Sequence, residues 1–167
     1  MQSGVADVGL PGSVVSSVQI DWRQQRVLVI AAHPDDEAIG CDGLISRVKR
    51  EGGQVHMLHV AIDDLVEYSP AGGSTARQRW AEIEQVAEFL SLDGWHAARI
   101  GERRTLRLDA LPRAELVDLL EGRPEHGVAL PVLRPTVVVA PEVTYVSLGR
   151  RLRYPTAICA TISRGIE

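Results

Sequence analysis

Short apolar runs rich in β-branched residues recur along the chain and predict the strands of a buried sheet. Residues Val27–Ala32 are continuously apolar, as a parallel strand covered on both faces requires. The segments Gln54–Ile62 and Thr136–Ala140 have the same character, and Trp95–Ile100 shows it more weakly. We therefore expect a sheet built from these segments, with a different periodicity in the stretches between them.

Between the strands, apolar residues recur at helical spacing and predict three helices. The first covers Ala38–Arg50 and ends at the Gly52–Gly53 pair, where a C-cap belongs. The second begins at a capping box formed by Thr75 and Gln78, and the third opens around Pro112, which suits a first helical turn. The apolar residues expected to face the sheet are Leu44, Ile45 and Val48 in the first helix, Ile83, Val86, Ala87 and Leu90 in the second, and Leu116, Val117, Leu119 and Leu120 in the third.

Strands that alternate with helices predict an α/β fold, here a three-layer, Rossmann-like, mostly parallel sheet flanked by helices. With 167 residues, the chain is long enough for one such domain and short for two. We expect the domain to cover residues 21–167, after a loosely ordered lead-in at 1–20 with a candidate edge strand at Val14–Ile20. Glu121–Pro135 is expected to be only a connection, and Ala157–Ile162 a buried terminal segment or an interface.

Charge and composition disfavour nucleic acid as a partner. Acidic residues outnumber basic ones, 22 against 18, for a formal net charge of -4. The aromatic residues are three Trp, three Tyr and one Phe, and no basic stripe with interleaved aromatics is present. A small polar molecule or a protein partner fits this surface better.

The sequence also predicts where the protein resides. Its N-terminal residues lack the basic and apolar regions of a secretory signal, and no run approaches the roughly 20 apolar residues of a membrane span. The two cysteines, Cys41 and Cys159, cannot build a disulfide framework, although one bridge between them is left open. We therefore expect a cytoplasmic protein without membrane contact.

The densest group of chemically active side chains follows the first strand. His33, Asp35, Asp36 and Glu37 fall within five residues, at a place where ligands of open α/β sheets bind. Acidic residues in a first helical turn are most often simple caps. Adding His33 weakens that interpretation, because His33 and Asp36 can turn onto one ion while Asp35 faces elsewhere, free to hold or deprotonate a water molecule.

These residues resemble a known family. The run Val27–Glu37, followed by Gly40–Gly43, is similar to the signature of the LmbE-like or PIG-L-type N-deacetylases, the GlcNAc-PI de-N-acetylase family. The likeness continues through the strand that ends in Asp63, through Arg79 and Glu82, which resemble the family's Arg-x-x-Glu, and through the last predicted strand. It covers most of residues 26–141.

The resemblance implies a zinc-dependent hydrolase that removes an acetyl group from an amino sugar or a related small N-acyl compound. His33 and Asp36 would be metal ligands and Asp35 the general base, since a metal lowers the pKa of bound water to about 7. Asp63 and Arg79 are candidates for substrate binding. For Arg79 and Glu82, an ion pair on the helix is the commoner role.

The end of the chain departs from the family pattern. A catalytic zinc ordinarily has three protein ligands and a water, and the resemblance implies that the third is the last residue of a His-x-Asp-His segment after the final strand. No histidine follows Pro141. Ser147, Gly149 and Arg150 stand where that segment would be. The third ligand of the family is therefore expected to be missing.

Other carboxylates could substitute for that ligand. Glu142 lies one residue beyond the last strand, and Asp63 and Asp64 follow the second strand. A site with more carboxylates would favour a harder or more weakly held metal than zinc. The remaining histidines are expected to have ordinary structural roles, most of them in the core: His56, His59, His96 and His126.

Two functions of different classes follow from these observations. The first is a metal-dependent deacetylase or amidase, because His33, Asp35 and Asp36 are all present. The second is a non-catalytic relative in which the Arg150 guanidinium pairs with Asp35 and Asp36 without a metal. Such a relative would bind a small molecule or serve as a partner subunit, and an exposed sheet edge would favour a homodimer.

Overall fold

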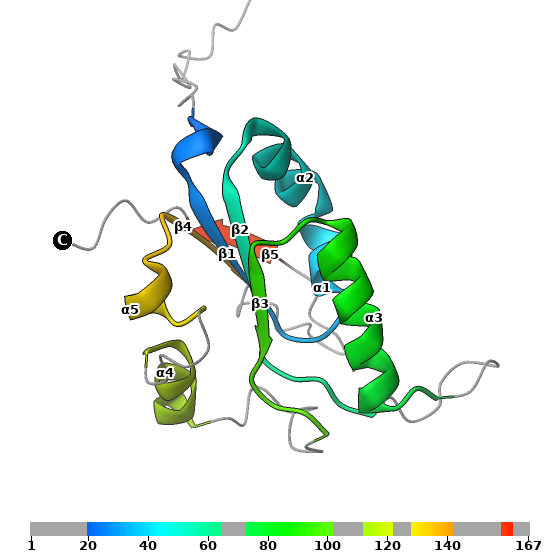
Figure 1. The fold of residues 1–167 in the computed structure, drawn as a ribbon. Helices are drawn as coiled ribbons and strands as arrows, with labels where there is room; N and C mark the ends of the chain where they lie inside the picture. Colours follow the sequence, from blue (N-terminus) through cyan, green and yellow to red (C-terminus); the bar gives the residue numbers. More distant parts are fainter. Residues whose placement is uncertain (1–19, 65–72, 102–111, 122–127, 142–157, 162–167) are drawn as a thin grey trace, which may run out of the picture.

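The computed structural model of the protein describes residues 20–64, 73–101, 112–121, 128–141 and 158–161 (Figure 1). Apart from Ile20, the lead-in with its candidate edge strand lies outside this range. No described helix is both long enough and apolar enough to cross a lipid bilayer. The elements are a 3-10 turn η1 (Trp22–Gln24), the strands β1 (Arg26–Ala31), β2 (Gln54–His59), β3 (Gly94–Ala97), β4 (Val137–Pro141) and β5 (Ile158–Thr161), and the helices α1 (Asp36–Gly40), α2 (Asp42–Glu51), α3 (Ala76–Phe89), α4 (Arg113–Glu121) and α5 (Leu130–Leu133).

The strands form one sheet in the order β3-β2-β1-β4-β5. Strands β1 to β4 run parallel, and β5 pairs antiparallel with β4 at the edge. The chain proceeds from β1 to β2 to β3 and then returns to the other side of β1 to form β4. The strand order therefore reverses at β1, and the crevice beyond the carboxyl end of such a strand is where α/β folds bind ligands. The predicted three-layer, mostly parallel α/β fold is confirmed.

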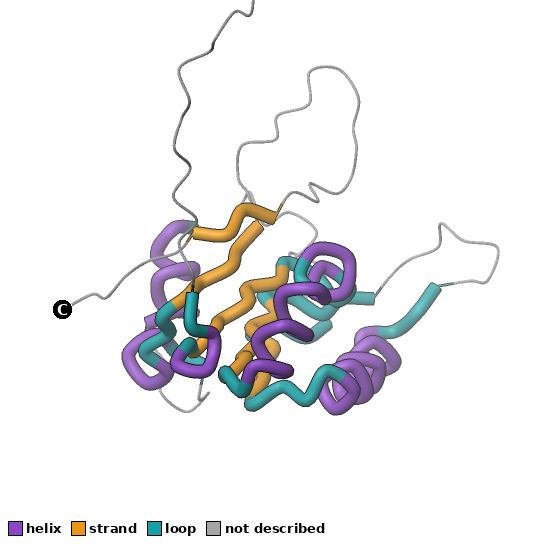
Figure 2. Tube along the Cα trace, turned by 90° about the horizontal axis from the view of Figure 1, so that it is seen from above, coloured by secondary structure: helices purple, strands orange, loops and turns teal. Residues whose placement is uncertain are grey.

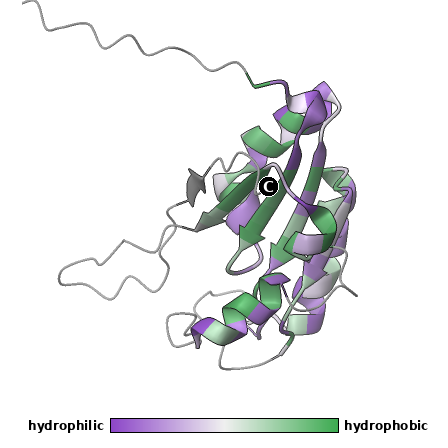
Figure 3. Cartoon of the chain, turned by 90° about the vertical axis from the view of Figure 1, so that its left-hand side faces the viewer, coloured by the Kyte–Doolittle hydropathy of each residue, from purple (hydrophilic) through white to green (hydrophobic). Residues whose placement is uncertain are grey.

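Helices cover both faces of the sheet, with α1, α2 and α3 on one side and α4 and α5 on the other (Figure 1 and Figure 2). The two faces separate along β1, where Val27 and Val29 contact one cluster of buried side chains and Leu28 contacts another. The first cluster includes Ile45 and Val48 of α2. Hydrophobic residues accordingly concentrate in the central strands (Figure 3). This sandwich holds the end of β1 in place for the loop that follows it.

The predicted start of the second helix is confirmed in α3, whereas the prediction for the first helix needs correction. Thr75 and Gln78 form the capping box in both directions, and α3 begins at Ala76. The single helix predicted over Ala38–Arg50 is instead two, α1 and α2, which meet at Cys41. Cys41 has φ −130° and ψ −3°, outside the helical region, and its side chain is buried in the core. The helical path is therefore interrupted at Cys41, the residue whose thiol enters the core.

Three further expectations about local structure were wrong. The stretch Glu121–Pro135 is more than a connection, because Leu130–Leu133 form α5 and Leu133 contacts the cluster around Leu28. Val117 was expected to be buried and is 42% exposed, since α4 turns its leucines toward the sheet instead. The strand predicted to reach Ile62 ends at His59. Past that point only an isolated bridge, Ile62 with Ile100, continues the pairing among the described residues.

Candidate functional site

The candidate site is the loop that leaves β1 at the strand where the sheet order reverses. The loop leads directly into α1, and Asp35 is the residue before the first turn of that helix. Its backbone has φ 104° and ψ −23°, in the region of positive φ that residues with a Cβ rarely adopt. Strained backbone of this kind persists only where its surroundings enforce it, and it clusters at functional sites.

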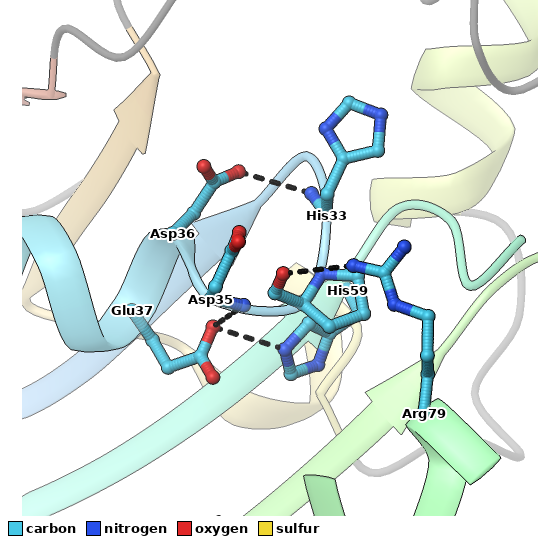
Figure 4. A network of polar contacts seen from close by, with 7 residues as sticks. His33, Asp35, Asp36, Glu37, His59 and Arg79 are labelled. Atoms are coloured by element: carbon cyan, nitrogen blue, oxygen red, sulfur yellow. Dashed lines mark hydrogen bonds and ion pairs between the residues drawn. The ribbon is translucent and has the colours of Figure 1, made fainter. Parts of the chain in front are cut away.

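Three side chains hold three consecutive backbone groups of this loop (Figure 4). Asp36 Oδ2 accepts a hydrogen bond from the His33 backbone N–H at 3.0 Å. The Arg79 guanidinium, on α3, donates to the Pro34 carbonyl oxygen at 3.0 Å. Glu37 Oε2 accepts from the Asp35 N–H at 3.1 Å. Each of these hydrogen bonds involves a charged side chain, and such bonds are stronger than those between neutral groups. Side-chain contacts therefore fix the backbone at each of the three residues.

Beneath the loop, Glu37 and His59 form a buried polar pair. His59 Nε2 lies 3.3 Å from Glu37 Oε2, and the two residues are 0% and 2% exposed. The edge of the His59 ring meets Trp95 at a centroid distance of 6.3 Å and an interplanar angle of 87°. Burial opposes ionisation of Glu37, but the hydrogen bond and charge attraction of His59 outweigh it, so that the pKa of Glu37 is lowered. Glu37 is thus held as a carboxylate inside the protein.

The carboxylate of Asp35 is not used to cap the helix that it precedes. An N-cap aspartate normally accepts a hydrogen bond from the first turn, but Asp35 makes no such bond. Burial raises the pKa of Asp35, and the neighbouring Asp36 carboxylate raises it further, while Arg79 acts in the opposite direction. A carboxyl group with a raised pKa and no capping role has the properties of a general base.

The donor types of His33 and Asp36 fit zinc, which binds imidazole nitrogen and carboxylate oxygen. Within the described residues, however, no group of three or more His, Cys, Asp or Glu side chains could hold a metal ion. In Figure 4 the His33 ring projects away from the carboxylate of Asp36, which is bound to the His33 backbone. The described loop therefore supplies two donors of suitable chemistry, and their role as ligands stays a prediction.

The residues expected to complete the site fall into two groups. Asp64 has a different task, because its Oδ1 accepts from the Ala76 N–H at 2.7 Å and so ties the end of the β2 segment to the start of α3. Asp63 is 3% exposed and lies at the same end of the sheet. The other predicted positions lie outside the described residues: Glu142, Ser147, Gly149 and Arg150.

Arg79 and Glu82 do not form the ion pair expected of them. Arg79 donates to the Pro34 carbonyl, and Glu82 is exposed on α3. The helix therefore directs its arginine at the candidate site loop instead of along its own surface. This contact joins α3 to the candidate site loop. Binding of a substrate by Arg79, which the sequence suggested, stays a prediction.

Sequence reasoning missed the pairing of Glu37 with His59. His59 was placed in the middle of its strand, because the strand was expected to extend to Ile62. In the structure His59 is the last residue of β2 and lies opposite Ala31, the last residue of β1. A strand predicted to end at His59 would have placed this residue at the carboxyl edge of the sheet, next to the loop. The position of His59 in the sequence was therefore the signal that could have revealed the pair.

Comparisons with known proteins agree with the resemblance found in the sequence. Residues 28–145 match the PIG-L family, described as GlcNAc-PI de-N-acetylase. No curated protein sequence matches the chain significantly.

Several solved structures are similar to the chain. The conserved protein TT1542 from Thermus thermophilus is 27% identical, with a TM-score of 0.46, over 68% of this chain and 44% of that one. The N,N'-diacetylchitobiose deacetylase from Pyrococcus horikoshii is 24% identical, with a TM-score of 0.49, over 74% of this chain and 43% of that one. A deacetylase of teicoplanin biosynthesis is 18% identical, with a TM-score of 0.48, over 69% and 54%. The chain thus spans about half the length of these structures.

Proposed function

Since the chain belongs to the PIG-L, or GlcNAc-PI de-N-acetylase, family, we propose that it is a zinc-dependent N-deacetylase of N-acetylated amino sugars or similar small molecules. One observation carries the proposal. At the strand where the sheet order reverses, the Asp35 carboxylate is left without a capping role while side chains fix the backbone around it. Such an arrangement suits a group that must move a proton at a defined position.

His33 and Asp36 are the residues that would hold the metal. Their imidazole and carboxylate are ordinary zinc donors, and the third ligand would come from outside the described residues, with Glu142 as the candidate that the sequence offers. When bound, zinc supplies Lewis-acid polarisation of the amide carbonyl and lowers the pKa of water.

Asp35 would move the proton in both halves of the hydrolysis. Its carboxylate accepts a proton from the attacking water as the oxygen of that water bonds to the acyl carbon. When the carbon–nitrogen bond breaks, Asp35 returns the proton to the departing nitrogen, so that acetic acid and the free amine leave. A single carboxyl group can serve as base and then acid because its protonation state is restored at the end of the cycle.

Arg79 would keep the loop in register with the substrate. It reaches the Pro34 carbonyl from α3 through one nitrogen, Nη2, at 3.0 Å. A guanidinium has five N–H donors in all, and those not used by Pro34 are suited to the hydroxyl groups of a sugar. Asp63, buried at the same end of the sheet, is the second proposed substrate contact.

The proposal is tested by amine release from N-acetylglucosamine, N,N'-diacetylchitobiose and N-acetylglucosaminyl-phosphatidylinositol, using protein reconstituted with zinc. We expect Asp35→Asn to lose activity by about 10²–10⁴-fold while it keeps its metal, because it removes general base catalysis alone. Asp36→Ala should lose both activity and metal. The exposed Asp118→Asn on α4 is the matched control and should retain both.

Metal content measured by elemental mass spectrometry on the same samples separates this function from its alternative. Zinc that is retained near stoichiometry and lost in Asp36→Ala supports the enzyme. Protein that takes up no zinc and releases no amine from any of the three substrates contradicts it, and favours a metal-free relative in which Arg150 neutralises the two aspartates.

A further inference from the structure

The buried pair below the loop has a role in the proposed reaction that the family match does not assign. We infer that Glu37, supported by His59, is a positioning residue that enforces the left-handed backbone of Asp35. By this route the pair aims the Asp35 carboxylate without touching the substrate. The role of Glu37 in catalysis rests on the proposed function.

The geometry of Asp35 requires such a device. Its φ of 104° crowds the Cβ, and the residue is not glycine. On its carbonyl side the backbone is already committed, because the Ala38 and Ile39 N–H groups both donate to the Asp35 oxygen at 3.0 Å. On its amide side, Glu37 Oε2 is the hydrogen-bond partner at 3.1 Å. The φ torsion lies between these two anchors. Arg79 holds the Pro34 carbonyl of the same peptide unit from α3, and Glu37 is the side chain that binds the Asp35 N–H itself.

Glu37 is suited to this task because it cannot easily give up its hydrogen bonds. The same oxygen, Oε2, receives the Asp35 N–H and faces His59 Nε2 at 3.3 Å. The Glu37 residue is 2% exposed, and a buried charge that loses its partners suffers a large desolvation penalty. Any relaxation of Asp35 toward ordinary backbone torsions would remove one of these partners.

His59 gives the carboxylate a fixed support. It is the last residue of β2, hydrogen-bonded into the sheet opposite Ala31, and its ring meets the Trp95 ring edge-on. The ring donates to Glu37 from Nε2, which in the neutral form leaves Nδ1 without a proton. Nδ1 is buried and has no hydrogen-bond partner among the described residues. The orientation of the ring is therefore set by Glu37 on one side and Trp95 on the other.

The test compares glycine and alanine at position 35, with each of three residues at position 37. Both substitutions remove the Asp35 carboxylate, but only alanine keeps a Cβ to be strained. While Glu37 is present, we expect Asp35→Gly to melt roughly 2–6 °C above Asp35→Ala, because glycine tolerates the enforced torsion. In the Glu37→Met background, where a weakly accepting thioether replaces the carboxylate, the loop is released and this advantage should vanish or reverse.

Glu37→Gln provides the conservative intermediate and protects the experiment against a variant that does not fold. Its amide oxygen can still accept from the residue 35 N–H, so the advantage of glycine should fall between the values for native Glu37 and for Glu37→Met. In the otherwise native chain, the Asp35 amide proton resonance should move upfield in Glu37→Gln. The exposed Glu88→Gln on α3 is the matched control and should change neither measurement.

A glycine advantage of the same size in all three backgrounds would overturn the inference, since another contact would then set the torsion. An absent advantage in the Glu37 background would overturn it as well. Neither the melting temperatures nor the amide resonance needs substrate or metal. A failure of this inference can therefore be told apart from a failure of the proposed function. If the enzyme is active, Glu37→Gln should lower kcat while leaving KM nearly unchanged.

Discussion

His59 Nε2 and Glu37 Oε2 lie 3.3 Å apart, with 0% and 3% of their side chains exposed. The two residues are 22 positions apart in the sequence and meet because β1 and β2 lie side by side in parallel register. A polar contact this deep is strongly context-dependent: the intact pair adds modestly to stability, whereas removal of one partner leaves the other buried and unsatisfied.

A double-mutant cycle measures this relationship. We expect His59→Leu and Glu37→Gln each to reduce the free energy of unfolding by about 1–3 kcal/mol. Combined, they should cost less than their sum, with a coupling of about 0.5–3 kcal/mol, because each change acts on a contact that the other has already weakened or removed. Urea denaturation of the four proteins provides the values.

His56→Leu is the matched control for that cycle. His56 lies on the same strand as His59 but is half-buried, and the hydrogen bond to Glu37 comes from His59 instead. Paired with Glu37→Gln, this change should give additive losses. Equal coupling in both cycles would mean that either histidine affects Glu37 through changes in β2 as a whole. That result would contradict a direct hydrogen bond between His59 and Glu37 as the source of the coupling.

Periodicity together with β-branched composition predicted most of the sheet and the main helical contacts. The short, continuous, β-branched run of β1 is typical of a strand covered on both faces, and helical spacing placed Ile45 and Val48 on the core side of their helix. The short helix α5 was missed because the stretch around it is rich in glycine and proline, which indicated a loop. Proline is compatible with a first helical turn, and burial of Leu133 decided the outcome.

The candidate site was only partly predictable, because its key contacts are not local. His33, Asp35 and Asp36 stand together in the sequence, and the family resemblance drew attention to them. The contacts of Glu37 with His59 and of Arg79 with Pro34 depend on strand register and on the approach of α3. The left-handed torsion of Asp35 has only a weak signature in the sequence, because glycine dominates such positions and aspartate adopts them only occasionally.

The thiol of Cys41 should be nearly inert in the native protein. Burial, followed by the nearby carboxylates of Glu37, Asp36 and Asp42, raises its pKa from 9.0 to about 11. This higher pKa alone reduces the thiolate fraction at pH 8 by about 100-fold. In a Cys159→Ser background, which isolates Cys41, alkylation by iodoacetamide should therefore be at least about 100-fold slower in native than in guanidinium-unfolded protein.

The same experiment bears on the disulfide that the sequence left open. Cys41 is a free cysteine in the structure. Unfolded wild-type protein, without reductant, should accordingly react through Cys41 as fast as the Cys159→Ser variant does. Rapid alkylation of the native Cys159→Ser protein would instead mean that the junction of α1 and α2 opens far more often than a 3% exposed side chain implies.

Stability should fall as the pH falls below neutrality, and His56 should account for part of that fall. Burial lowers the pKa of His56, and the positive charges of Lys49 and Arg26 add to this effect, while Asp93 opposes it. The unfolded chain therefore binds the proton more tightly, at the ordinary pKa of about 6.5. Stability from neutral His56 is complete above that value and declines as the pH falls from there through the lower native pKa.

Replacing His56 with Gln removes this contribution. The difference in unfolding free energy between wild type and His56→Gln, measured by urea denaturation from pH 8 to pH 5, should shift in favour of the variant below about pH 6.5. The other histidines titrate in both proteins, so they largely cancel in the difference. A difference that is constant with pH would contradict a lowered native pKa at His56.

Two glycines at either end of α2 should respond in opposite directions to the same substitution. A Cβ at Gly53 would collide with the Trp22 carbonyl oxygen and lie 2.7 Å from Val48 Cγ1 and 3.3 Å from the Gln25 carbonyl oxygen. Two of these atoms belong to backbone that leads into β1, so the chain cannot relax without moving the strand. We expect Gly53→Ala to cost about 1–3 kcal/mol in unfolding free energy.

Gly43, in the first turn of α2, has no atom within 4 Å of an added Cβ. Gly43→Ala should therefore stabilise the protein by about 0.5–1 kcal/mol, because alanine loses less conformational entropy than glycine in a helix. Both changes add one methyl group, but at different places: Gly43 lies within α2, whereas Gly53 follows the Gly52 C-cap and faces the backbone that leads into β1. A loss at Gly43 equal to that at Gly53 would mean that both glycines are needed for flexibility, and that the close approach of η1 to Gly53 does not limit this position.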